Sequence, residues 1–219
     1  MTVFDTQLRR RLDGPLSRAA EAIDVPWLSP NRLTAAGLAT GIGSAVAAAS
    51  TLWGLALALW LVSRVFDGLD GPLARHRLAV RAVHGDAEGD GPPESAAGGF
   101  FDITADFVVY GSTVVGVVLG ASREHGAAWW PFLLVLLAYY VNGTAFLAFS
   151  SIAERTGRRI DDGRSLSFLG GMAEGAETIA VHSLWLIVPF WAEGIAVVWA
   201  GVVGLSAAHR IVTGFAALS

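Results

Sequence analysis

Apolar residues gather in six long runs along this chain, and short polar stretches separate them. The runs cover residues 33–50, 53–74, 99–121, 128–150, 176–192 and 195–213. Each run has about 17–23 residues, close to the ~20 that a helix needs to cross the hydrocarbon core of a membrane. The pattern predicts an all-α integral membrane protein with six transmembrane helices. Tight connections are expected at 50–52 and at 192–194.

Residues 1–28 have a different pattern, in which apolar residues recur at helical steps. The positions that share this face are Phe4, Leu8, Leu12, Leu16, Ala19 and Ile23. This spacing predicts an amphipathic juxtamembrane helix that lies on the inner surface of the membrane. The alternative is a polar tail without stable structure.

The arginines indicate the orientation of the six helices. Outside the runs, nearly all of them fall on one side of the arrangement, and only Arg123 falls on the other. Basic loops stay on the cytoplasmic side of a membrane. Both termini are therefore expected in the cytoplasm, with the chain crossing the inner (plasma) membrane several times.

The composition agrees with a lipid environment. Hydrophobic residues make up 53% of the chain and charged residues only 16%, whereas soluble domains carry about 25% charged residues. There is no cysteine, which excludes a disulfide framework and thiolate chemistry. The modest net charge of -4 argues against nucleic acid as a partner.

Four aspartates interrupt the apolar pattern. Asp67 and Asp70 lie near the end of the second run, and Asp102 and Asp106 near the start of the third. Each is a candidate functional residue, because an ionised carboxylate in hydrocarbon is costly. Their spacing places each pair on one face of its helix. Since the two helices run in opposite directions, both pairs are expected at a similar depth near the cytoplasmic side.

Four carboxylates brought together need cations or protons, because like charges repel strongly in a low dielectric. Oxygen ligands without His or Cys favour Mg²⁺, Mn²⁺ or Ca²⁺ over zinc. Two such ions could clamp a phosphoryl group. One alternative is a set of structural salt bridges with Arg64, Arg75 and Arg77. Another is a cation-coupled transporter, in which buried carboxylates mark an ion pathway.

The arrangement of these residues resembles the signature of the CDP-alcohol phosphotransferase family, D-x2-D-G-x2-A-R followed by G-x3-D-x3-D. All eight defining positions are present, namely Asp67, Asp70, Gly71, Ala74, Arg75, Gly98, Asp102 and Asp106. The resemblance covers nearly the whole chain as one domain, 1–219. One departure is the stretch 76–97, which is longer than usual in the family and is interpreted as an inserted cytoplasmic loop.

The resemblance implies an enzyme of phospholipid biosynthesis. It would transfer a phosphatidyl group from a CDP-linked donor, CDP-diacylglycerol, to an alcohol, and release CMP. The family also implies a homodimer and two divalent cations, Mg²⁺ or Mn²⁺, held by Asp67, Asp70, Asp102 and Asp106. Asp106 would in addition be the catalytic base. The reverse arrangement, a CDP-linked headgroup and a lipid alcohol acceptor, stays open.

The same resemblance implies a substrate site. Gly71, Ala74 and Arg75 would line the pocket for the cytidine diphosphate, with Asn31 and Thr34 near it. Glycine at Gly98 would leave room for a nucleotide or a neighbouring helix. An arginine suits a pyrophosphate, because its guanidinium can bind two oxygens at once.

The acceptor site is open to several interpretations. Arg155 could bind a phosphate of the lipid or substrate, or it could belong to a solvated cytoplasmic loop. Glu174 and Glu177 lie three residues apart at the start of the fifth run. They could contact the acceptor alcohol or favour the helix N-terminus, where negative charge is stabilising.

Overall fold

The computed structural model describes residues 14, 18–84, 94–157 and 175–219. This part of the chain contains helices and no strand, which confirms the all-helical prediction. The elements are α2 (Pro30–Ala49), α3 (Trp53–His84), α4 (Glu94–His125), α5 (Trp130–Arg155), α6 (Gly175–Ile187), the short 3₁₀ helix η1 (Pro189–Trp191) and α7 (Ala192–Leu218). Five of the six apolar runs each correspond to one long helix, and the fifth run, 176–192, covers the shorter α6 and η1.

Three helical segments of the described residues are long and apolar enough to cross a membrane. They are Ala96–His125, Trp130–Arg155 and Pro189–Leu218. Helix α6 has only 13 residues, and α3 carries the charged residues Arg64, Asp67 and Asp70 in its middle. That all six helices cross the membrane stays a prediction.

The chain divides into two compact units. One comprises residues 7–116 and contains α2, α3 and most of α4; the other comprises residues 1–6 and 117–219. All four aspartates of the sequence motif belong to the first of these units.

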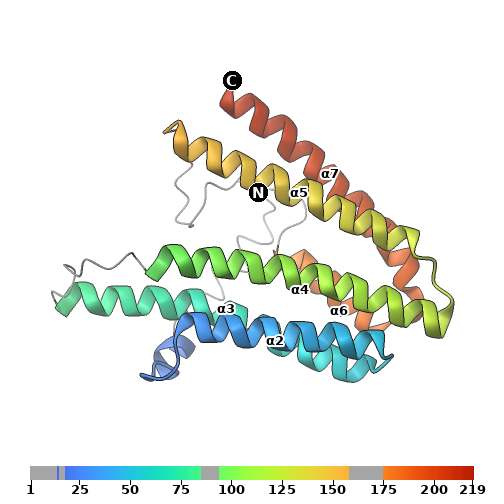
Figure 1. Cartoon of the computed structure of the whole chain (residues 1–219), viewed down its shortest axis with the longest axis horizontal. Coiled ribbons are helices and arrows are strands. Elements are labelled where there is room, and N and C mark those ends of the chain that lie inside the picture. Colours follow the sequence, from blue (N-terminus) through green and yellow to red (C-terminus); the bar gives the residue numbers. More distant parts are fainter. Residues whose placement is uncertain (1–13, 15–17, 85–93, 158–174) are drawn as a thin grey trace. The chain divides into compact units, whose positions relative to one another are not determined.

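In the first unit, α2 and α3 form an antiparallel pair (Figure 1). Ser29 caps α2 by accepting a hydrogen bond from the backbone N–H of Arg32 at 3.3 Å, and Pro30 suits the first turn. The helices are joined at 50–52, where Thr51 has a φ of 60°. The Ser63 hydroxyl of α3 donates to the carbonyl oxygen of Gly37 in α2 at 2.7 Å. The turn therefore lies where the sequence predicts it.

Small residues let α2 approach α4. A Cβ atom at Gly41 would lie 2.6 Å from both methyl groups of Val109, and one at Gly116 would overlap the backbone of Ala45. Glycine at both positions removes the atoms that would separate the two helices. This close packing fixes the start of α4 against the α2–α3 pair.

Helices α3 and α4 extend well beyond the apolar runs. The predicted inserted loop 76–97 is helical at both ends, since α3 continues to His84 and α4 begins at Glu94. Residues 85–93 lie outside the described part. The sequence 74–83 is rich in Ala and Arg, which favour helix even where hydropathy falls. Pro72 lies inside α3.

The end of the N-terminal segment packs against the first unit. Residues 18–22 are helical, and Ala20 is fully buried in a cluster with Leu33 and Leu73. The Arg77 guanidinium donates to Asp24 at 2.7 Å and 2.9 Å and to the carbonyl oxygen of Leu28 at 2.8 Å. Most of the predicted surface helix lies outside the described residues, so it stays a prediction.

In the second unit, α5 packs along α7. The Tyr139 hydroxyl lies 2.9 Å from Nε2 of His182 and accepts a hydrogen bond from the indole of Trp199 at 2.7 Å. The connection between α6 and α7 comes earlier than the predicted 192–194, because Pro189 disfavours helical geometry at Val188. Val188 indeed has a φ of −128° and a ψ of 65°.

Candidate functional site

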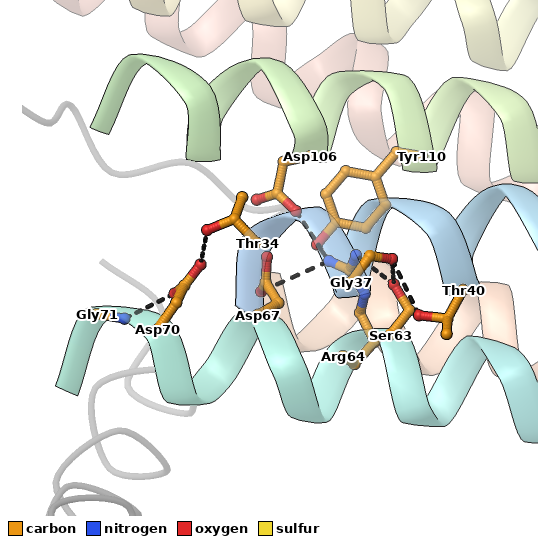
Figure 2. A network of polar contacts seen from close by, with 10 residues as sticks. All are labelled: Thr34, Gly37, Thr40, Ser63, Arg64, Asp67, Asp70, Gly71, Asp106 and Tyr110. Carbon is orange, nitrogen blue, oxygen red and sulfur yellow. Dashed lines mark hydrogen bonds and ion pairs between the residues drawn. The ribbon is translucent and has the colours of Figure 1, made fainter. Parts of the chain in front are cut away.

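Carboxylates from two helices face one another beside the start of α2 (Figure 2). Asp67 and Asp70 project from α3, and Asp106 projects from α4. Asp67 and Asp106 both contact the guanidinium of Arg64. Asp102 lies one turn before Asp106 on α4. The structure thus brings Asp67 and Asp106 together through Arg64, with Asp70 and Asp102 about one turn away on the same two helices.

Arg64 lies between the two helices' carboxylates. Its Nη1 atom is 2.8 Å from Oδ1 of Asp106 and 3.5 Å from Oδ2 of Asp67. The same atom donates to the Tyr110 hydroxyl at 3.2 Å, and Nη2 donates to the Ser63 hydroxyl at 3.1 Å. One guanidinium therefore compensates part of the negative charge of the cluster.

Aromatic rings enclose this guanidinium. Its central carbon lies 5.0 Å from the ring centroids of both Trp60 and Tyr110. The Arg64 side chain is only 6% exposed, whereas those of Asp67 and Asp106 are 29% and 33% exposed. Cation–π contacts are strongest where the cation is desolvated. The buried arginine is held by the rings on one side and by the more exposed carboxylates on the other.

Asp70 has partners of its own. Its Oδ2 accepts a hydrogen bond from the Thr34 hydroxyl at 2.5 Å, and its Oδ1 accepts one from the backbone N–H of Gly71 at 2.6 Å. These bonds fix the orientation of a carboxylate that is only 6% exposed. Thr34, expected near the nucleotide pocket, therefore lies directly beside a predicted metal ligand.

The other predicted substrate residues come together in pairs. Arg75 is exposed, and its Nη1 lies 3.3 Å from the position that a Cβ of Gly71 would take. The Oδ1 atom of Asn31 lies 3.1 Å from the corresponding position at Gly98. Ala74 is half-buried, one turn beyond Asp70. Side chains at Gly71 and Gly98 would therefore crowd Arg75 and Asn31.

A small cavity opens beside the carboxylates. Its walls come from α2, α3 and α4 and include Thr34, Gly37, Leu38, Arg64, Asp67 and Asp106. A cation or water molecule that enters this cavity meets two carboxylates and one guanidinium.

The donor set suits a hard divalent cation, since it consists of oxygen atoms alone. Yet within the described residues no three acidic or histidine side chains are close enough to form a finished metal site. Arg64 lies between Asp67 and Asp106 and contacts both carboxylates. The carboxylate oxygens are chemically suited to a metal ion, and the positive charge of Arg64 lies beside them.

Of the three arginines in the salt-bridge alternative, Arg64 pairs with the aspartates of the motif. Arg77 pairs with Asp24 instead. The spacing Trp60, Arg64 and Asp67 on α3 places these side chains on one helix face, as Asp106 and Tyr110 are on α4. Trp60 and Tyr110 are site residues that the sequence analysis did not identify, and this spacing is the signal that points to them.

The predicted acceptor residues belong to the other unit. Glu177 lies in the first turn of α6, and its buried Oε2 atom has no hydrogen-bond partner within the described part. Arg155 is exposed at the end of α5. Glu174 lies outside the described residues. Their role in acceptor binding stays a prediction.

Comparison with known proteins finds relatives both in sequence and in structure. The inner membrane protein YnjF of Escherichia coli (strain K12) is 30% identical over 221 residues, which cover 99% of this chain and 97% of that protein. No model of a known protein family matches the chain.

Among the solved structures with a similar fold is the Mycobacterium tuberculosis phosphatidylinositol phosphate synthase (PgsA1) with CDP-DAG bound. The two share a fold with a TM-score of 0.64 over 94% of each chain, at 18% sequence identity. A membrane location is supported by the inner membrane relative and by the three long apolar helices. The chain belongs to the same family as the inner membrane protein YnjF, and it has the fold of a CDP-DAG-binding phosphatidylinositol phosphate synthase.

Proposed function

We propose that this protein is a membrane-bound CDP-alcohol phosphatidyltransferase. The donor is CDP-diacylglycerol and the acceptor is a small polar alcohol. The acceptor oxygen forms a bond to the phosphorus that carries the diacylglycerol, while the bond from this phosphorus to CMP breaks. The products are a phosphodiester lipid and CMP, and the hydroxyl proton passes to the protein.

The observation that carries the proposal is the convergence of all four motif aspartates. Asp67 on α3 and Asp106 on α4 meet at Arg64, and Asp70 and Asp102 lie about one turn away on the same helices, in the order and spacing of the family signature. A structural salt-bridge network would match each carboxylate with a cation, but Arg64 alone contacts both Asp67 and Asp106 here. The fold shared with a synthase that binds CDP-DAG supports the same function.

The roles of the side chains follow from their places. Asp106 is the proposed base, because it is among the more exposed carboxylates of the cluster and reaches the cavity. Thr34 and the Gly71 backbone orient Asp70. Arg75 is exposed near Gly71, where a guanidinium could bind the pyrophosphate of the donor.

Asp67, Asp70, Asp102 and Asp106 are the proposed ligands of two divalent cations, Mg²⁺ or Mn²⁺. When bound, such ions would neutralise the charge that develops on the phosphoryl oxygens. The protein's own contribution is to hold the four carboxylates on two packed helices. The six-span topology with a cytoplasmic site and the homodimer belong to the same proposal.

The test is CMP release by the purified full-length protein in detergent. CDP-diacylglycerol is supplied with glycerol 3-phosphate, inositol, inositol phosphate, serine, ethanolamine or choline, each with Mg²⁺, Mn²⁺ or EDTA. One alcohol should stimulate CMP release, and EDTA should abolish it. Asp106→Asn should be inactive, whereas Asp24→Asn should retain activity, since it removes an aspartate that pairs with Arg77 outside the site.

Other outcomes would change the assignment. Release only from CDP-choline or CDP-ethanolamine with diacylglycerol would identify a headgroup transferase. A cation flux in proteoliposomes without any CMP release would identify a transporter. CMP release that is insensitive to EDTA and to Asp106→Asn would contradict the proposed site.

A further inference from the structure

We propose that Arg64 is a displaceable counter-ion of the metal site. Its guanidinium contacts both Asp67 and Asp106, and it would give up these carboxylates to a divalent cation. Arg64 would then set the affinity for the metal. This inference rests on the proposed function, because it requires that the aspartates bind metal.

The geometry shows a competition for the same oxygen atoms. Nη1 of Arg64 approaches Asp106 at 2.8 Å and Asp67 at 3.5 Å, and these two carboxylates come from different helices. A cation that bridges α3 and α4 needs the same two side chains. The two positive groups cannot occupy the space between these carboxylates together, since they would repel each other in a low dielectric.

The ion pairs between Arg64 and the carboxylates do not use the full hydrogen-bonding capacity of the guanidinium. The contact with Asp67 is at the long end of an ion pair, and Nε of Arg64 has no hydrogen-bond partner within the described residues. A divalent cation carries twice the charge of the guanidinium and accepts more oxygen ligands. The carboxylates therefore gain more from the metal than from the arginine.

Neutral partners can keep the guanidinium in place after the carboxylates turn to the metal. The rings of Trp60 and Tyr110 lie 5.0 Å from it, and the hydroxyl of Ser63 accepts from it at 3.1 Å. None of these contacts uses a carboxylate. Arg64 thus needs to release only its ion pairs, and it can stay buried.

The same exchange would prepare the proposed base. As long as Arg64 donates to Oδ1 of Asp106, the guanidinium engages this oxygen. Release of this bond leaves the oxygen available to metal and acceptor hydroxyl. Arg64 is then a positioning residue, because it acts through Asp106.

The experiment measures Mn²⁺ binding to the purified full-length protein in detergent, by electron paramagnetic resonance of the free ion. Arg64→Gln and Arg64→Met remove the charge, and Arg64→Lys retains it without the planar group. Both neutral variants should bind Mn²⁺ at least about tenfold more tightly, the factor that corresponds to one charge-assisted hydrogen bond. Arg64→Lys should fall between them and the wild type.

Arg77→Gln is the matched control, because Arg77 pairs with Asp24 and not with the motif; its Mn²⁺ affinity should equal that of the wild type. A merely structural Arg64 would lower thermal stability in EDTA and leave the affinity unchanged, which would overturn the inference. Weaker binding by the neutral variants would overturn it too. If the wild type binds Mn²⁺ and releases CMP in these cases, the proposed function stands; if no variant binds Mn²⁺, both fail.

Discussion

Two polar clusters are buried among apolar helices of this protein, and they differ in charge. In residues 7–116, Arg64 lies among four carboxylates, so negative charge exceeds positive charge. In residues 117–219, Tyr139, His182 and Trp199 form a chain of hydrogen bonds that needs no net charge. Both clusters lie in an apolar environment, where burial of a polar group costs free energy unless the group is hydrogen-bonded or paired.

The two clusters therefore serve different ends. The neutral cluster joins the Tyr139 hydroxyl to His182 and Trp199, and the ring of His182 also packs against Trp185 with the ring centroids 4.9 Å apart, so it adds to packing. Among the described residues the charged cluster has more carboxylates than cations, and it opens on a cavity. An excess of charge indicates binding and chemistry, whereas hydrogen bonds between neutral side chains indicate stability.

The substitution Asp106→Asn gives the largest expected effect. It should lower CMP release by about 10²–10⁴-fold, the contribution of a general base. The free energy of unfolding should change by no more than about 1 kcal/mol, because asparagine keeps an acceptor oxygen for Arg64. Activity and denaturant unfolding in detergent, measured on the same preparation, check both values. A variant that is equally active but unstable would reverse the difference between the clusters.

The helices and the shared face of the aspartates are predictable because they depend on local periodicity. Asp67 and Asp70 lie three residues apart on one helix, and the sequence alone gives that spacing. The pairing of Arg64 with Asp106 joins residues 42 positions apart. It depends on the crossing of α3 and α4, which hydropathy does not specify. The sequence identifies Arg64 as a possible salt-bridge partner of the aspartates. It does not predict that Arg64 contacts both Asp67 and Asp106.

The ends of the elements were less predictable for a related reason. Hydropathy shows where the apolar surface of a helix ends. The helix itself ends only where the backbone leaves helical geometry. Helix α3 therefore continues ten residues beyond the second run to His84. At Pro189 the opposite happens, because the run stays apolar while the missing N–H and the fixed φ of proline end α6 early. Backbone chemistry determined both differences.

Gly116→Ala should destabilise the protein without touching either polar cluster. The added Cβ would overlap the backbone of Ala45, and overpacking of this kind costs about 1–3 kcal/mol. Gly111→Ala is the matched control on the same helix, since a Cβ there meets nothing within 4 Å. Chemical unfolding of the two variants separates helix packing from charge on α4. An equal stability of the two would show that α2 and α4 do not pack closely at this point.

Tyr139→Phe tests the neutral cluster. It removes the hydroxyl that accepts from Trp199 and bonds His182, and hydrogen bonds inside membrane proteins contribute about 0.6 kcal/mol each on average. The expected loss is about 1 kcal/mol of unfolding free energy, with CMP release per folded molecule unchanged. Tyr140→Phe, at a side chain that is 71% exposed, should have no effect. A loss of activity without a loss of stability would assign chemistry to this cluster.

Arg77→Gln gives the smallest expected effect, because its ion pair with Asp24 lies near the surface. The two side chains are 24% and 27% exposed, and exposed pairs contribute about 0.2–1 kcal/mol. The loss should shrink at high salt, since solvent ions screen partly exposed charges. Unfolding of Arg77→Gln, Asp24→Asn and the double variant at low and high salt measures the pair directly. Charge alone then does not define the active cluster: Arg77 and Asp24 balance each other in contact with water, whereas Asp67 and Asp106 share the buried guanidinium of Arg64.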